Sequence, residues 1–379
     1  MATTSLEKIF FPLLVLFHVI GMETLSRPDL FRKKSLFRLA GNVPKYFYNL
    51  VVFFNITFQI MRVFMFRDTK GQCASVAVLL LPLSAHISIH RSRRKIRLIL
   101  KKLFRIFKIL NSTEECKTYK ISIAFACFCL NIAPTYAAVF FNSNMRLQDR
   151  QDVMNNPHIG ENLKMIGLII LDVWFVSNIL VTVSFFVPFC LYFLFTCCYT
   201  KVLLEKFISE FKIMVLRKDY QILLEVYHEL KQVIELMDDF LSYPAFVTVI
   251  SIMASLFWAG YTMVFFHNDD YASIACLSLV IVLFSSYLFM IMLPASSVNE
   301  SSAVAKEAIF SLPGYIPRHY KALKACVRKR FRQREPALTL WRIYRIDKPL
   351  LISTIGTLVT YGFLVGTLGS VQSSISEMY

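Results

Sequence analysis

One apolar stretch near the end of the chain combines residue types that could pack closely and contact ions. Residues 349–370 read PLLISTIGTLVTYGFLVGTLGS and contain no charged residue, so the stretch can lie in hydrocarbon without desolvating a charge. Four of the eleven glycines of the chain fall within it. Gly362 and Gly366 have the GxxxG spacing that favours helix association in lipid, and threonines are interleaved with the glycines. The composition predicts a helix that packs closely against others and leaves polar groups for water or ions.

Enzyme chemistry is not indicated by any motif. The sequence has no phosphate-binding loop, no H-E-x-x-H motif and no Cys-x-x-Cys pair. His86 and His90 are one helical turn apart, but they lie beside Arg91 and lack a third ligand, so we interpret them as interfacial residues. Asp172 is the exception among predicted membrane helices that otherwise almost lack acidic residues, and it suits either a ligand pocket or a structural hydrogen bond. We therefore expect no enzyme, no cofactor, no bound metal and no proton- or sodium-coupled transporter.

The elements that carry these residues are long apolar helices. The chain has 379 residues, of which 56% are hydrophobic, against about 45–50% in soluble proteins. Most of its apolar segments are about 20 residues long, which is enough to span a bilayer core as a helix. We predict an all-α polytopic membrane protein with seven transmembrane helices, at about 44–66, 72–90, 119–141, 165–199, 243–266, 272–294 and 349–370.

The basic residues predict the orientation. With the N-terminus in the cytoplasm, the four inner regions contain 34 of the 42 Lys and Arg residues, whereas the outer loops contain five. This asymmetry is a strong positive-inside signal, and it also accounts for the net charge of +17 without a nucleic-acid partner. G-protein-coupled receptors have the opposite orientation, and neither their Asp-Arg-Tyr nor their Asn-Pro-x-x-Tyr motif occurs in the expected helices. We predict a cytoplasmic N-terminus and an extracellular C-terminus.

The chain divides into three predicted regions. Residues 1–43 form a cytoplasmic segment with an interfacial helix, 44–348 contain the first six transmembrane helices, and 349–379 contain the last helix with a short extracellular tail. Apolar residues recur at helical spacing through 201–241, which predicts long cytoplasmic helices that pack on one another or on a neighbouring subunit. The basic amphipathic segment 91–110 suits a helix on anionic lipid, or alternatively a calmodulin target.

The last helix resembles the C-terminal signature of arthropod gustatory receptors, which belong to the insect chemoreceptor superfamily together with the odorant receptors. That signature is Thr-Tyr, five mostly apolar residues, then Gln-Phe. Thr360 and Tyr361 match it, whereas Thr367 and Leu368 stand where Gln and Phe are expected. A second segment, LLEVYHELKQVIELMDDFLSYPAF at 223–246, is similar to the family's entry into the fifth helix. The motifs cover some fifty residues, and the length and predicted topology match over the whole chain.

This resemblance implies a tetrameric, ligand-gated, non-selective cation channel in the plasma membrane of chemosensory neurons. The last helices of four subunits, identical or different, would line one pore, and the long cytoplasmic helices would anchor the assembly. By position, Thr367 takes the place of the pore glutamine, Leu364 would be the hydrophobic constriction, and Thr360 and Val371 complete the stripe. The alternatives are packing of this stripe within one subunit, an odorant-receptor-like subunit, or a non-conducting membrane scaffold.

The expected partners are an external small-molecule tastant, cations and membrane lipid. The resemblance places a ligand pocket among the first six helices, and the outer halves of these helices offer aromatic walls with a few polar groups. Such residues also collect at membrane interfaces for other reasons. The candidate ligand-binding residues are Tyr136, Asp172, Trp174, Trp258, Tyr261 and Ser273.

Overall fold

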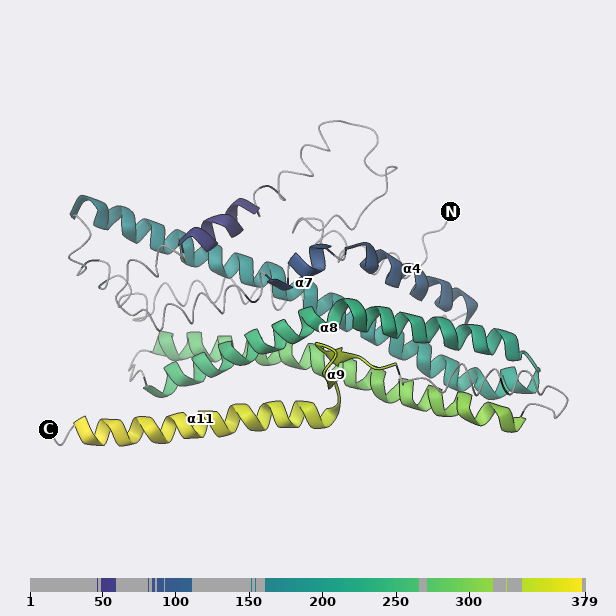
Figure 1. Cartoon of the computed structure of the whole chain (residues 1–379). Coiled ribbons are helices and arrows are strands. Elements are labelled where there is room, and N and C mark those ends of the chain that lie inside the picture. Colours follow the sequence, from purple (N-terminus) through teal and green to yellow (C-terminus); the bar gives the residue numbers. More distant parts are fainter. Residues whose placement is uncertain are drawn as a thin grey trace, which may run out of the picture.

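The structure is a computed structural model, and its described part is almost entirely helical. Three long helices, α7 (Glu161–Leu216), α8 (Tyr220–Phe265) and α9 (Tyr271–Tyr315), lie side by side (Figure 1). A shorter helix, α4 (Arg93–Ile109), packs on α8 and α7, and α11 (Lys348–Ser376) runs beside α8 and α9. The described residues are 46, 49–58, 81, 84–85, 87–91, 93–110, 151, 154, 161–265, 271–315, 325 and 336–376.

The long helices extend well beyond the thickness of a bilayer. At 1.5 Å per residue, the 56 residues of α7 span about 84 Å, whereas the hydrocarbon core is about 30 Å thick. The long helices predicted over 201–241 are therefore confirmed as the end of α7 and the first half of α8, whereas their cytoplasmic side stays a prediction. Lys218 between them has a φ of 63°, and the Asp219 N–H donates to the Met214 carbonyl at 3.0 Å. α7 ends here, because Lys218 adopts the left-handed conformation and the hydrogen bond of Asp219 reaches back five residues instead of four.

The core lies where α7 packs against α8 and α9. The Phe186 ring of α7 stacks on Tyr287 of α9, with 5.8 Å between ring centroids. Further along α7, Tyr192 meets Phe240 of α8 at 6.5 Å. These aromatic contacts join the three helices into one body.

The apolar face of α4 is buried inside the protein and cannot lie on a membrane. Ile96, Ile99, Leu103 and Ile106 are fully buried within the same hydrophobic cluster as α7, α8 and α9. The chain's own helices cover this face, so it is unavailable to lipid or calmodulin. The predictions that the apolar face of 91–110 lies on anionic lipid or binds calmodulin are therefore wrong. The amphipathic pattern itself is the one expected.

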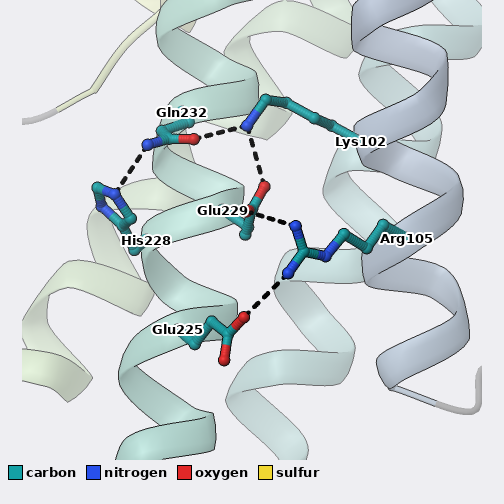
Figure 2. A network of polar contacts seen from close by, with 6 residues as sticks. All are labelled: Lys102, Arg105, Glu225, His228, Glu229 and Gln232. Atoms are coloured by element: carbon teal, nitrogen blue, oxygen red, sulfur yellow. Dashed lines mark hydrogen bonds and ion pairs between the residues drawn. The ribbon is translucent and has the colours of Figure 1, made fainter.

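The polar side of α4 is held to α8 by a network of charges, shown in Figure 2. Lys102 donates to Glu229 at 3.0 Å and to Gln232 at 2.6 Å. Arg105 bridges Glu229 at 3.4 Å and Glu225 at 3.1 Å. Only 12% of the Glu229 side chain is exposed, so its carboxylate is the least screened member of the network.

A small β-hairpin precedes α11, which the all-α fold predicted from the sequence does not include. β1 (Thr339–Leu340) pairs antiparallel with β2 (Tyr344–Arg345), with Thr339 opposite Arg345 and Leu340 opposite Tyr344. The hairpin lies near the middle of α8 and α9, and α11 runs from there along the bundle (Figure 1). The last predicted helix is confirmed, and it extends to Ser376.

Three helices of the described part are long and apolar enough to cross a membrane, namely Phe186–Leu216 of α7, Tyr220–Met263 of α8 and Tyr271–Tyr315 of α9. The predicted spans 44–66 and 72–90 fall largely outside the described residues, and 119–141 falls wholly outside them. The number of spans, the sides of the termini and the three-region division stay predictions.

Removing the shared carboxylate should loosen α4. We expect Glu229→Ala to destabilise the protein by about 1–3 kcal/mol, because the largely buried Lys102 loses its charged partner, while the exposed Arg105 loses one of its two and keeps Glu225. Thermal unfolding of the detergent-purified protein measures the effect. The matched control is Glu205→Ala, which removes an exposed pair with Lys201 and should change stability by less than about 0.5 kcal/mol. Equal shifts for both variants would contradict this role.

Candidate functional site

Most of the described side chains of α11 are left uncovered by the described part of the chain. Ile352 is 70% exposed, Phe363 74% and Leu364 51%, and no charged residue occurs after Lys348 within the helix. An apolar surface of this length requires a non-aqueous environment. Lipid, or another copy of the chain, must therefore cover this helix.

Gly356 and Gly362 of α11 make no close contacts with the described part of this chain. A Cβ atom added at Gly356 or at Gly362 would meet nothing within 4 Å. The alternative that the glycine-rich stripe packs tightly within one subunit thus has no support at these two positions. Any close approach that needs glycine there would involve a second molecule.

The predicted pore residues lie on the exposed part of α11. The Thr360 hydroxyl donates to the Gly356 carbonyl at 2.8 Å, and the Thr367 hydroxyl donates to the Leu364 carbonyl at 2.9 Å. Each hydroxyl is satisfied as a donor by its own helix and keeps lone pairs that can face water or a cation. Val371 lies in α11, but its side chain is outside the described part. The pore assignment stays a prediction.

An apolar groove of about 700 Å³ separates α11 from α8 and α9. Its size falls within the range of small-molecule sites, and its walls are hydrophobic. Among its residues, sequence reasoning named Tyr261 and Thr367 as site residues and Gly362 for its GxxxG spacing, because the others have the composition of any membrane-facing surface. The groove is lined by Leu256, Phe257, Gly260, Tyr261, Ile281, Ser285, Leu288, Phe289, Ile355, Leu358, Val359, Gly362, Phe363 and Thr367.

Thr367 lies where the groove meets the predicted stripe. Residues of a helix are about 100° apart, so Val359, Gly362 and Phe363 point toward the groove, whereas Thr360 and Leu364 point to one side of it. Thr367 falls between the two directions and lines the groove. It therefore belongs to the edge of the stripe rather than to its centre.

The candidate ligand residues fall into different surroundings. On α7, Trp174 is 7% exposed and stacks on Phe58 with 5.2 Å between ring centroids. Asp172, two residues earlier, lies about 200° around the same helix, so it cannot face the same pocket as Trp174. On α8, Trp258 is 63% exposed and stacks on Tyr261 at 6.1 Å.

The remaining candidates differ in accessibility. Ser273 is buried on α9. Tyr136 lies outside the described residues. A buried hydrogen bond from the Asn55 amide to the Ser177 hydroxyl, at 2.9 Å, lies next to the Trp174 cluster and was not predicted. Of the three residues that the structure brings together near α7, only Trp174 was a predicted candidate, and Asn55 and Ser177 are additions from the structure.

The hairpin before α11 is fixed to α8. The Asp238 carboxylate accepts hydrogen bonds from both the N–H and the hydroxyl of Thr339, each at 2.7 Å. At the turn, the Trp341 N–H donates to the Ser242 carbonyl at 3.1 Å, and the Trp341 ring packs on Phe246 at 4.9 Å. Burial raises the pKa of Asp238, although the bonds from Thr339 and the charge of Arg342 oppose the shift.

An unusual turn closes this hairpin. Trp341 and Arg342 have φ angles of 50° and 57°, and the Ile343 N–H donates to the Leu340 carbonyl at 3.0 Å. Two successive positive φ angles define a type I′ turn, for which Asn-Gly is the preferred sequence. Here both positions are bulky, so contacts outside the turn must hold it. Arg342 pairs with Asp239 of α8, which also pairs with Lys95 just inside α4.

Comparison with known proteins identifies solved structures of the same fold. The chain is similar to the insect olfactory receptor OR5 from Machilis hrabei, with a TM-score of 0.63 and 14% identity over 95% of this chain and 98% of that chain. For the same receptor in complex with eugenol, the TM-score is 0.65 at 14% identity, over 96% of this chain and 98% of that chain. No protein-family model and no curated protein matches the sequence. The likeness confirms the all-helical membrane fold.

Asp238 should make stability depend on pH. Its raised pKa means that the folded state binds the proton more readily than the unfolded state, so its contribution favours folding at low pH and is lost as the pH rises through the raised pKa. Asp238→Asn keeps the Oδ1 acceptor, and at neutral pH it should be at least as stable as the wild type. We expect that advantage to shrink as the pH falls.

The matched variant is Asp238→Ala, which leaves the N–H and hydroxyl of Thr339 without this acceptor and should cost about 1–3 kcal/mol. Thermal unfolding of the purified protein at neutral and acidic pH measures both variants. An Asn variant as unstable as the Ala variant at neutral pH would refute this account.

Proposed function

We propose that this chain is a subunit of a chemoreceptor in the plasma membrane, a ligand-gated cation channel opened by an external small molecule. The observation that carries the proposal is α11, which is uncharged after Lys348 and exposes apolar and hydroxyl side chains over its described part, in a chain with the fold of an insect olfactory receptor. A helix that only anchored the chain would need neither the glycines nor the hydroxyls.

Assembly of several copies would cover this helix. Gly356 has open space around it within the described part of the chain and does not line the groove, which suits close approach by another copy. The resemblance to gustatory receptors implies four copies around one axis. Copies of α11 would then line a shared path whose apolar part closes by dewetting, with Leu364 as the constriction.

Thr367 should set the wider part of this path. A threonine is shorter than the glutamine expected there, and its hydroxyl is bonded to its own helix at 2.9 Å. Its place at the edge of the stripe further reduces its reach into the path. The proposed selectivity is therefore that of a wide, weakly selective cation pore.

The candidate binding surroundings have apolar, aromatic walls with few polar groups, which suit a small, mostly apolar ligand. Thr360 and Tyr361 match the gustatory signature, and on this basis we propose a tastant as the ligand. OR5 binds eugenol, so small volatile aromatics belong in the same test. The candidate surroundings are the Trp174 cluster on α7 and the stacked pair Trp258 and Tyr261 on α8.

The pore assignment predicts position-dependent block. In cells expressing the chain, we record currents evoked by sugars, bitter compounds and eugenol, with Cys placed at Thr360 or at Leu364. An external, charged thiol reagent should abolish most of the current at either position, because both would face the path. The control is Phe363→Cys, next along the helix and facing the groove, which should conduct normally after treatment. Block at Phe363 alone would overturn the assignment.

The assembly predicts a second outcome that needs no ligand. Gly356→Leu should reduce the fraction of oligomer in detergent, because Gly356 does not line the groove within the chain and a larger side chain there prevents close approach by another copy. The control is Gly314→Leu on α9, where a Cβ also meets nothing within 4 Å but no interface is proposed. Particle images should show four-fold symmetry for the wild type and for the control. A monomeric wild type without current would support the scaffold alternative.

A further inference from the structure

A buried asparagine on α9 holds both ends of the hairpin. Asn299 is 1% exposed, and its Nδ2 donates to the Leu338 carbonyl at 3.0 Å and to the Ile346 carbonyl at 2.7 Å. Its Oδ1 accepts from the Leu338 N–H at 2.7 Å. Both donors and the acceptor of one amide are thus used on the residues that flank the two strands. One turn later, Ser302 donates to the Pro336 carbonyl at 3.0 Å.

The same hairpin is held from its other side by α8. Asp238 fixes Thr339 in β1, and Ser242 accepts from the N–H of Trp341 at the turn. Arg342 pairs with Asp239, which Lys95 of α4 also contacts. The hairpin is therefore bonded to α8 and α9, and it is linked to α4 only through Asp239, so any relative movement of α8 and α9 acts on it directly.

No flexible linker separates the hairpin from α11. Ile346 is fully buried and bonded to Asn299, and the helix begins two residues later at Lys348. Asp347 caps α11, since its carboxylate accepts from the Leu350 N–H at 3.0 Å. Lys348 also pairs with Glu300, the neighbour of Asn299, at 2.8 Å. Beyond this first turn, α11 is largely exposed.

We propose that the hairpin, residues 338–346, is the element by which α8 and α9 set the position of α11, and that Asn299 is the positioning residue that latches it. The inference rests on the proposed channel function. In an isolated subunit, α11 is held mainly at its first turn, so a shift of the latch by the long helices moves the start of the proposed pore helix. The two strands carry this shift as one unit because Asn299 bonds to both flanks.

The test uses the full chain in detergent, with hydrogen exchange as the first readout. Asn299→Ala should speed exchange roughly tenfold in peptides covering 336–346 and the first turn of α11, with the 201–215 part of α7 unchanged. Ser302→Ala, which removes one bond only, should give a smaller change in the same direction and serves if the first variant folds poorly. The matched control is Ser311→Ala on the same helix, whose hydroxyl bonds only to the Ala308 carbonyl.

The second readout is the current evoked by whichever probe of the sugar, bitter and eugenol panel activates the wild type. Asn299→Ala should shift the concentration for half-activation several-fold while leaving the reversal potential unchanged, since permeation belongs to other residues. Faster exchange with an unchanged concentration dependence would overturn the latch and leave the channel proposal intact. If the wild type carries no current, the channel proposal fails. The latch is overturned separately if Asn299→Ala speeds exchange only in 336–346 and leaves the first turn of α11 unchanged.

Discussion

The aromatic packing of α7 against α8 and α9 is the interaction on which the rest of the structure depends. Phe186 and Tyr287 join α7 to α9, whereas Tyr192 and Phe240 join α7 to α8. Near the end of α7, Phe207 packs on Tyr227 of α8, with 5.9 Å between the ring centroids. These contacts follow the three helices from their most apolar parts into the region rich in charges. α4, the hairpin and α11 all attach to the surface that this packing creates.

Unlike the core helices, α11 is largely exposed, and a lipid environment explains how an exposed apolar helix can be stable. A helix in hydrocarbon satisfies its own backbone hydrogen bonds, so it does not need a packed partner to remain a helix. The chain can therefore leave α11 largely uncovered and hold it at its first turn through Asp347 and the hairpin. Stability resides in the three long helices, while the uncovered helix keeps its surface for other molecules. This division would suit the pore-lining role proposed for α11.

Sequence alone predicted what depends on length and periodicity. The apolar repeat over 201–241 correctly placed Phe207 and Tyr227 on buried faces. The same repeat in 91–110 could not show what covers the apolar face, because lipid and a neighbouring helix favour the same pattern. Asp172 and Trp174 share a predicted depth, but depth does not determine which side of the helix each residue faces. Asn299 is recognisable only once segments 39 and 47 residues away lie beside it.

The turn of the hairpin shows why its docking and its folding are one process. Bulky residues in left-handed conformations cost about 1–3 kcal/mol each, and Trp341 and Arg342 both adopt them. Their compensation comes from α8, through the ring contact of Trp341 with Phe246 and the pairing of Arg342 with Asp239. A hairpin detached from α8 would lose that compensation and would favour another conformation. The hairpin is therefore well defined only while it is docked, so the arrangement of α8 and α9 determines whether α11 starts from a fixed point.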